Sequence, residues 1–132
     1  SENFGYNAKN GFLGMQDLGD YYKDNKPVFI TEGVICYAYL KQNGFNALAS
    51  LGSHLSNYQT QIIDRLGYKA VIVPDNDQAG DIYAKQILNK KKYEKTLKQT
   101  RIFKVKNAKD IDDERKLGKE YEKNLLKELR RI

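Results

Sequence analysis

The sequence predicts an α/β fold: a four-stranded parallel sheet with helices on both faces, of the Rossmann-like kind. Two observations lead to this prediction. Short apolar segments alternate with helical patterns along the chain, and segments such as "AVIV" (70–73) are apolar at every position. Strands of that composition occur in parallel sheets that helices cover on both sides. A sheet of this kind binds ligands beyond the carboxyl ends of its strands.

Four segments are expected to form the strands. Each is short and rich in apolar or β-branched residues, and the four are 28–31 ("VFIT"), 46–50 ("NALAS"), 70–73 ("AVIV") and 101–105 ("RIFKV"). Short runs of this kind favour strands over helices. With right-handed crossovers between them, the order 2-1-3-4 brings the first and third strands together.

Apolar residues at helical spacing predict the helices, which cover 15–22, 34–42, 56–66, 77–91 and 114–131. Ser56 and Gln59 form a capping box, and Gly44 and Gly67 suit helix ends. The inner faces are expected to carry Ile35, Ala38 and Tyr39 in the second helix, Ala79, Ile82, Tyr83 and Ile87 in the fourth, and Leu117, Tyr121, Leu125 and Leu129 in the last.

Composition and charge limit the class of protein. The 132 residues are enough to bury a core. Lys and Arg number 23 against 17 Asp and Glu, and the net charge of +6 favours polyanionic partners such as nucleic acid. The single Cys36 excludes an internal disulfide and a multi-cysteine zinc site. No membrane-spanning run and no signal peptide is seen, so a cytoplasmic protein without a membrane partner is expected.

Acidic residues follow three of the expected strands. Glu32 follows the first, Asp75 and Asp77 follow the third, and Asp110, Asp112 and Asp113 follow the fourth. Because parallel strands end at the same edge, these carboxylates are expected to converge. Residues two apart in an extended chain share a side, so Asp75 and Asp77 point together while Asn76 points away. Crowded carboxylates need a cation between them, and their oxygens suit Mg²⁺ or Mn²⁺.

A simpler interpretation competes with this one. An aspartate near a helix start is often only an N-cap or a partner of the helix dipole, and for Asp75 alone the two interpretations have even odds. Acidic residues in surface loops, such as Asp112 and Asp113, are solvated more often than functional. The ordered combination of Glu-Gly, Asp-x-Asp and Lys-Asp after successive strands favours a site.

The segments "ITEGVICYAYLKQNGFNALASLGSHLSNYQ" and "VIVPDNDQAGDIYAKQI" resemble the Toprim domain, in the version found in DNA primases of bacterial and phage type. The shared features are Glu-Gly, a Leu-Gly-Ser loop and Asp-x-Asp-x-Ala-Gly, and the later "AKDIDD" resembles a primase Lys-Asp segment. The resemblance covers about residues 11–113. It implies a lead-in segment (1–26), a Toprim catalytic domain (27–113) and a C-terminal helix (114–132).

The resemblance also implies roles for individual residues. The implied catalytic residues are Glu32, Asp75 and Asp77, the implied ligands of Mg²⁺ or Mn²⁺ are Asp75, Asp77, Asp110, Asp112 and Glu32, and the implied phosphate or nucleic-acid contacts are Lys109, Gly33 and Gly80. At the two glycines, the missing Cβ lets backbone approach a phosphate or lets a helix pack closely on a strand.

The implied activity is that of a DNA primase, which makes RNA primers on single-stranded DNA by magnesium-dependent nucleotidyl transfer. The implied partners are the DNA template, nucleoside triphosphates and, in the full-length parent, a replicative helicase. Two alternatives stay open: a Toprim nuclease, and a non-catalytic nucleotide-binding module or a module that docks through its last helix. No zinc ribbon is present, so we expect a fragment or a single-domain relative that is inactive alone. A topoisomerase is disfavoured, because no tyrosine stands out as its nucleophile.

Overall fold

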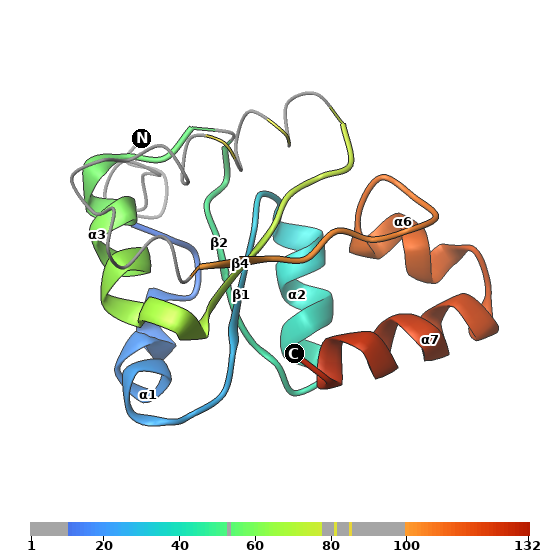
Figure 1. Ribbon diagram of the computed structural model, residues 1–132, viewed down its shortest axis with the longest axis horizontal. Coiled ribbons are helices and arrows are strands. Elements are labelled where there is room, and N and C mark those ends of the chain that lie inside the picture. Colours follow the sequence, from blue (N-terminus) through green and yellow to red (C-terminus); the bar gives the residue numbers. More distant parts are fainter. Residues whose placement is uncertain (1–10, 53, 78–80, 82–84, 86–99) are drawn as a thin grey trace.

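The computed structural model describes residues 11–132 except 53, 78–80, 82–84 and 86–99. Within these residues the chain forms a four-stranded sheet in which every neighbouring pair is parallel (Figure 1). The strands are β1 (Val28–Thr31), β2 (Asn46–Ala49), β3 (Ala70–Val73) and β4 (Arg101–Ile102), in the order β2-β1-β3-β4. The predicted fold class and strand order are confirmed.

Helices cover both faces of the sheet (Figure 1). One face carries α1 (Leu18–Lys23), which follows the 3₁₀ turn η3 (Met15–Asp17), and α3 (Asn57–Leu66), which precedes the 3₁₀ turn η4 (Gly67–Lys69). The other face carries α2 (Val34–Gln42), α6 (Ile111–Lys116) and α7 (Lys119–Arg130). Among the described residues, no helix combines the length and the apolar character that crossing a lipid bilayer requires.

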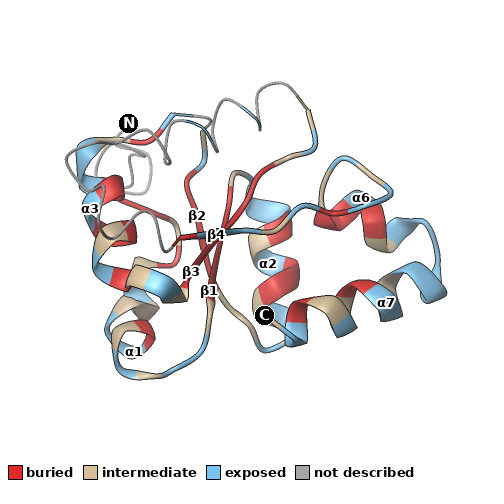
Figure 2. Ribbon diagram, viewed as in Figure 1, coloured by how far each residue is buried: buried red, intermediate tan, exposed pale blue. Residues whose placement is uncertain are grey.

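β1 and β3 are buried at every position and β2 at all but its first, as the sequence predicts, whereas both residues of β4 are exposed (Figure 2). Successive residues of β1 point to opposite faces. Val28 and Ile30 join the core beneath α1 and α3, whereas Phe29 joins the core beneath α2, α6 and α7. Both end segments contribute as well: Phe12 packs in the first core, and Leu129 packs in the second. The two cores therefore hold the strand ends in fixed positions.

Side-chain hydrogen bonds stabilise the start of α3 and the end of α1. The capping box at α3 is confirmed, since the Ser56 hydroxyl accepts from the Gln59 N–H and the Gln59 side chain accepts from the Ser56 N–H. Lys69 Nζ donates to the carbonyls of Tyr21, Tyr22 and Asp24 at the end of α1. A lysine that satisfies carbonyls at a helix C-terminus also complements the helix dipole.

The predicted inner face of α2 is only partly right. Ile35 is 61% exposed and Ala38 is also exposed. The buried residues are Cys36, Tyr39 and Leu40, so the face that meets the sheet is rotated by about one residue from the predicted one. Cys36 and Leu40 are four residues apart and therefore share a side of the helix.

The prediction of one helix over 114–131 is wrong. Gly118 separates α6 from α7 and has φ 143° and ψ 170°, a conformation that is essentially restricted to glycine. From this residue α7 runs back toward the sheet (Figure 1). As a result Leu125 and Leu129 are buried as predicted, whereas Leu117 and Tyr121 are exposed.

The fourth strand is shorter than predicted. Regular pairing ends at Ile102, and Phe103 N–H donates once more to the Ile72 carbonyl. Pro74 follows β3 and has no N–H, so it cannot extend the pairing. The predicted helix over 77–91 lies largely outside the described residues; Asp81 and Lys85 are helical, and Asp81 N–H donates to the Asp77 carbonyl.

Replacement of Gly118 by alanine tests the cause of the helix break. A Cβ at Gly118 would meet no atom within 4 Å, so any loss of stability comes from the backbone conformation. We expect Gly118→Ala to lower the free energy of unfolding by about 1–3 kcal/mol, measured by urea denaturation.

Gly19→Ala is the matched control, because Gly19 lies in α1 and its added Cβ also meets nothing within 4 Å. At this helical position alanine should raise the free energy of unfolding by roughly 0.4–1 kcal/mol. A Gly118→Ala protein as stable as the parent would contradict the proposed cause of the break.

Candidate active site

The carboxyl ends of β1 and β3 form one side of an open cleft of about 490 Å³. β1 and β3 pair in register, with Thr31 opposite Val73. The residues that follow them are therefore brought together. The lining residues are Glu32, Gly33, Leu51, Gly52, Asp75, Asp77 and Lys109. Five of these are residues that the sequence singles out, and they come from three separate loops.

A direct hydrogen bond joins the loops after β1 and β3. The Asp75 backbone N–H donates to Glu32 Oε2 at 3.0 Å. The other oxygen of Glu32 makes no hydrogen bond with any described residue. The Glu32 carbonyl accepts from the Leu51 N–H at 2.9 Å, which also ties the loop after β2 to this edge of the sheet. Glu32 thus fixes the cleft through both its backbone and its side chain.

Electrostatic crowding is visible at Asp75. Burial is the main cause that raises the pKa of the Asp75 carboxyl to about 6 from its ordinary value of 3.8. The negative charges of Glu32, Asp110 and Asp77 also raise this pKa, and the positive charge of Lys109 opposes them. The cleft therefore holds more negative charge than the protein itself neutralises.

Asn76, which the sequence analysis does not select, connects the Asp-x-Asp loop to the segment that carries Lys109. Its Nδ2 donates to the carbonyls of Val105 (3.0 Å) and Ala108 (3.3 Å), and its backbone N–H donates to the Lys109 carbonyl at 2.6 Å. The side chain points away from the cleft, as expected. Its partners lie about thirty residues along the chain, so no local sequence signal indicates them.

Lys109 lies loosely against the acidic residues. Its Nζ is 3.6 Å from Asp77 Oδ2, and its side chain is 56% exposed. An exposed ion pair of this length contributes little to stability. Lys109 is therefore able to bind a phosphate group without a large cost.

The two remaining predicted metal ligands, Asp110 and Asp112, lie in different surroundings. Asp110 caps α6, since its Oδ1 accepts from the Asp113 N–H, yet it lies close enough to raise the pKa of Asp75. Asp112 is buried and forms ion pairs with Lys116 and Arg115, which lower the pKa of its carboxyl. It lines a different cavity. The structure does not bring Asp112 into the cleft, and we do not carry it forward as a metal ligand.

Of the two glycines predicted to contact phosphate or nucleic acid, the structure describes only Gly33. Gly33 lines the cleft, and a Cβ there would meet no protein atom within 4 Å, so the fold itself does not require glycine at this position. Gly80 lies outside the described residues. Leu51, a cleft residue that the sequence analysis does not select, has φ 61°, an uncommon backbone conformation for a leucine.

The donor set fits a hard divalent cation. Carboxylate oxygens predominate at the cleft, and their mutual repulsion is what a bound cation would relieve. Across the described ranges, no three Asp, Glu, His or Cys side chains already stand in the arrangement of a metal centre. A site that offers only a few protein ligands suits an ion that retains several of its waters, as Mg²⁺ does.

The raised pKa of Asp75 has a consequence for stability. The folded state binds a proton at Asp75 more readily than the unfolded chain does, because its pKa is about 6 in the folded state. Without metal, this group therefore favours the folded state most below about pH 4, and the benefit is lost as the pH rises to about 6.

Asp75→Asn should remove this dependence. We expect the unfolding free energy of the variant, relative to the parent, to increase between about pH 4 and pH 6 and then to stay level, measured by urea denaturation with a chelator present. The control is Asp20→Asn, at an exposed aspartate of α1. Its curve of unfolding free energy against pH should run parallel to that of the parent. Parallel curves for Asp75→Asn as well would show that Asp75 is not held in a crowded, partly buried environment.

Asn76→Ala tests the connection between the two loops. Removal of the Nδ2 donor should speed hydrogen exchange at the Asn76 amide, which donates to the Lys109 carbonyl, and lower global stability by only about 1 kcal/mol per lost bond. The control Asn43→Ala removes one side-chain hydrogen bond at the end of α2 and should leave hydrogen exchange at the Asn76 amide unchanged. Equal exchange at Asn76 in the parent and in Asn76→Ala would mean that the connection does not depend on this side chain.

Residues 29–115 match the model of a family described as Toprim-like. A comparison with curated proteins found no match, and a comparison with solved structures found none. Toprim domains occur in primases, nucleases and topoisomerases, and they are often catalytic modules that bind divalent metal ions. The predicted Toprim domain is confirmed, whereas the primase type stays a prediction. Because the match covers more than half of the chain, including every residue that lines the cleft, the protein belongs to the Toprim-like family.

Proposed function

We propose that this Toprim domain catalyses nucleotidyl transfer of the DNA primase type, making RNA primers on a single-stranded DNA template from nucleoside triphosphates. The observation that carries the proposal is the cleft in which Glu32, Asp75 and Asp77 meet Lys109. Acidic and cationic groups side by side suit a substrate that brings both a metal ion and phosphates. On this proposal the protein acts in the cytoplasm, with a replicative helicase as a partner in its full-length parent.

Asp75 and Asp77, with Asp110 nearby, are the residues that would hold Mg²⁺, or Mn²⁺ in its place. The bound ion supplies positive charge that lowers the pKa of an attacking hydroxyl and neutralises charge on the leaving group. Asp75, with its pKa near 6, is mainly ionised at neutral pH and becomes protonated below it. Metal binding should accordingly weaken as the pH falls below about 6.

The protein side chains supply binding and orientation. Lys109 places an exposed ammonium group at the cleft for a substrate phosphate, and Asn76 holds the backbone of Lys109 in register with the aspartates. The Glu32 oxygen that makes no bond to a described residue is available to accept a proton or to approach a cation. Side chains that the fold holds in position need little reorganisation when the reaction takes place.

A Toprim nuclease would use the same cleft with water as the attacking group, so the two activities are separated by assay. A module that docks through the apolar side of its last helix is disfavoured, because Leu125 and Leu129 are buried in the protein's own core. Leu126, the third leucine of that helix, is also partly buried against the same core.

Asp75→Asn and Asp77→Asn test the proposal. Each keeps the side-chain volume and removes a carboxylate charge, and we expect primer synthesis to fall roughly 10²-fold or more, the order seen when one group that stabilises a transition state is removed. Primer synthesis on single-stranded DNA is measured with the longest natural protein that contains this chain. Hydrolysis of the same DNA without nucleoside triphosphates measures the nuclease alternative.

Binding of Mn²⁺ is measured separately on the 132-residue chain by paramagnetic broadening of backbone amide signals. Broadening should centre on the loops that carry Glu32 and Asp75, and both variants should reduce it. Asp20→Asn, on the far end of the fold, should keep both binding and activity. Full primer synthesis in both cleft variants would rule out the catalytic role of the two aspartates.

A further inference from the structure

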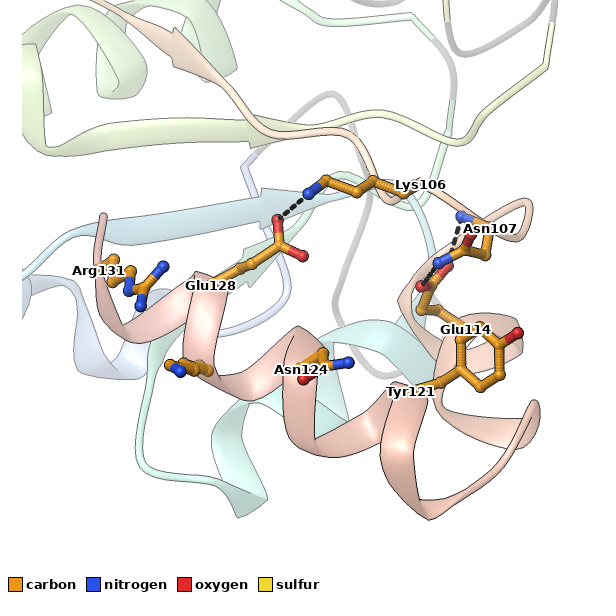
Figure 3. Close-up of a pocket in the computed structure, with 8 residues that line it drawn as sticks. Lys106, Asn107, Glu114, Tyr121, Asn124, Glu128 and Arg131 are labelled. Carbon is orange, nitrogen blue, oxygen red and sulfur yellow. Dashed lines mark hydrogen bonds and ion pairs between the residues drawn. The ribbon is translucent and has the colours of Figure 1, made fainter.

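A second cavity, separate from the cleft, lies between α7 and the segment that precedes α6 (Figure 3). It is a groove of about 330 Å³, and each side chain that lines it in the described part of the chain is polar, charged or phenolic. Lys106 and Asn107 form one wall, while Tyr121, Asn124 and Arg131 lie along α7 on the other (Figure 3). A groove without aliphatic side chains is not a gap left by incomplete packing of the core.

Four side chains of this groove have donors with no protein partner. Tyr121, Asn124, Lys127 and Arg131 make no side-chain hydrogen bond or ion pair with the described part of the chain. The first three lie on α7 and Arg131 caps its C-terminus; Tyr121 and Arg131 are ten residues apart, which is about 15 Å along a helix. Such a row offers a phenol ring, an amide and two positive charges to one elongated ligand.

The carboxylates of the groove are already engaged. Both oxygens of Glu114 accept from Asn107, one from its backbone N–H at 2.8 Å and one from its Nδ2 at 2.7 Å. Glu128 Oε2 is 3.5 Å from Lys106 Nζ (Figure 3). The Lys106 side chain is 72% exposed, so this ion pair contributes little to stability. The groups left over for a ligand are therefore donors and cations.

We propose that this groove binds single-stranded nucleic acid. The ligand must be rich in acceptors and negatively charged, which a phosphate backbone is, and it must benefit from an exposed aromatic ring. Tyr121 is 43% exposed, and stacking of a base on such a ring is tolerant of sequence. A length of about 15 Å accommodates a few nucleotides of a single strand.

One segment of chain contributes to both the groove and the catalytic cleft. Lys106 lines the groove and Lys109, three residues later, lines the cleft. A strand bound along α7 would pass these two lysines before it reaches Asp77. This placement of the strand rests on the proposed function, whereas binding in the groove does not depend on catalysis.

An acidic peptide is the competing ligand, because it would satisfy the same cations. The row of donors does not distinguish the two polyanions, but Tyr121 does, since a stacked base gains more from the ring than a carboxylate side chain does. The test therefore treats the charges and the ring separately and includes a peptide competitor.

Binding is measured as the fluorescence anisotropy of a labelled oligothymidylate of about 12 nucleotides, within the usual range of single-strand sites. The 132-residue chain is used with a chelator present, so that metal binding at the cleft does not contribute. The double variant Lys127→Gln with Arg131→Gln should weaken binding about ten-fold. It should also reduce the slope of log affinity against log salt by roughly 1.4, which is about 0.7 for each lost phosphate contact.

The matched control is Lys119→Gln with Lys123→Gln, which removes the same charge from α7 at residues that do not line the groove. It should lower the affinity much less. Tyr121→Ala should weaken binding by roughly 5- to 100-fold through lost stacking, and Tyr121→Phe should restore it. All of these side chains are exposed, and far-ultraviolet circular dichroism checks that each variant folds.

Equal losses in the two charge variants would overturn the proposal, because binding would then follow net charge alone. A Tyr121→Ala protein that binds like the parent, or a polyglutamate peptide that competes as well as unlabelled oligonucleotide, would also overturn it. Asp75→Asn should bind the oligonucleotide at least as tightly as the parent, because the variant removes a negative charge from the metal-free cleft. Loss of primer synthesis in Asp75→Asn with intact binding, or loss of binding in the groove variants with an intact cleft, separates failure of one proposal from failure of the other.

Discussion

The cleft depends on the parallel pairing of β1 with β3. Thr31 and Val73 are opposite each other at the ends of these strands, so Glu32 and Asp75 follow from adjacent points of the sheet. The Asp75 N–H then donates to the Glu32 carboxylate, and this bond keeps two like-charged residues close. An order that placed another strand between β1 and β3 would separate the two acids, because each strand adds about 5 Å across a sheet. The adjacency of β1 and β3 is thus a requirement of the site.

Crowding of negative charge at this edge is possible because the surrounding loops are held elsewhere. Asn76 binds three backbone groups of the 105–109 segment, and Glu114, which is buried, holds that segment from the opposite side through Asn107. A buried carboxylate is tolerated only where its oxygens are satisfied, and both oxygens of Glu114 are. Burial is the main cause of the raised pKa of Asp75, and repulsion from Glu32, Asp110 and Asp77 adds to it. The hydrogen bonds outside the cleft hold the loops in place against this repulsion, which a bound cation would relieve.

The sequence predicts the sheet and the convergence of Glu32, Asp75 and Asp77 well, because both follow from a general property of parallel strands. It fails where the outcome depends on distant partners. The spacing of Ile35, Ala38 and Tyr39 fits a helix as well as the true buried set does, and only packing on the sheet decides between them. The break at Gly118 interrupts an apolar spacing that would continue through it. The bonds of Asn76 depend on the path of a loop about thirty residues away.

The net charge of +6 does not show that charge is distributed unevenly between the cleft and the groove beside α7. The cleft gathers acids and keeps one loosely paired lysine, whereas in the groove beside α7 the side chains of Asn124, Lys127 and Arg131 have no partner among the described residues. The described lining of the groove carries three cations (Lys106, Lys127 and Arg131) and two acids (Glu114 and Glu128), so the two sites differ in sign although they share one segment of chain. A polyanion would be repelled by the cleft in the absence of metal and attracted by the groove. On our two proposals, a nucleic-acid strand would be held by α7, and a cation bound at the acidic edge would make that edge accessible to phosphate.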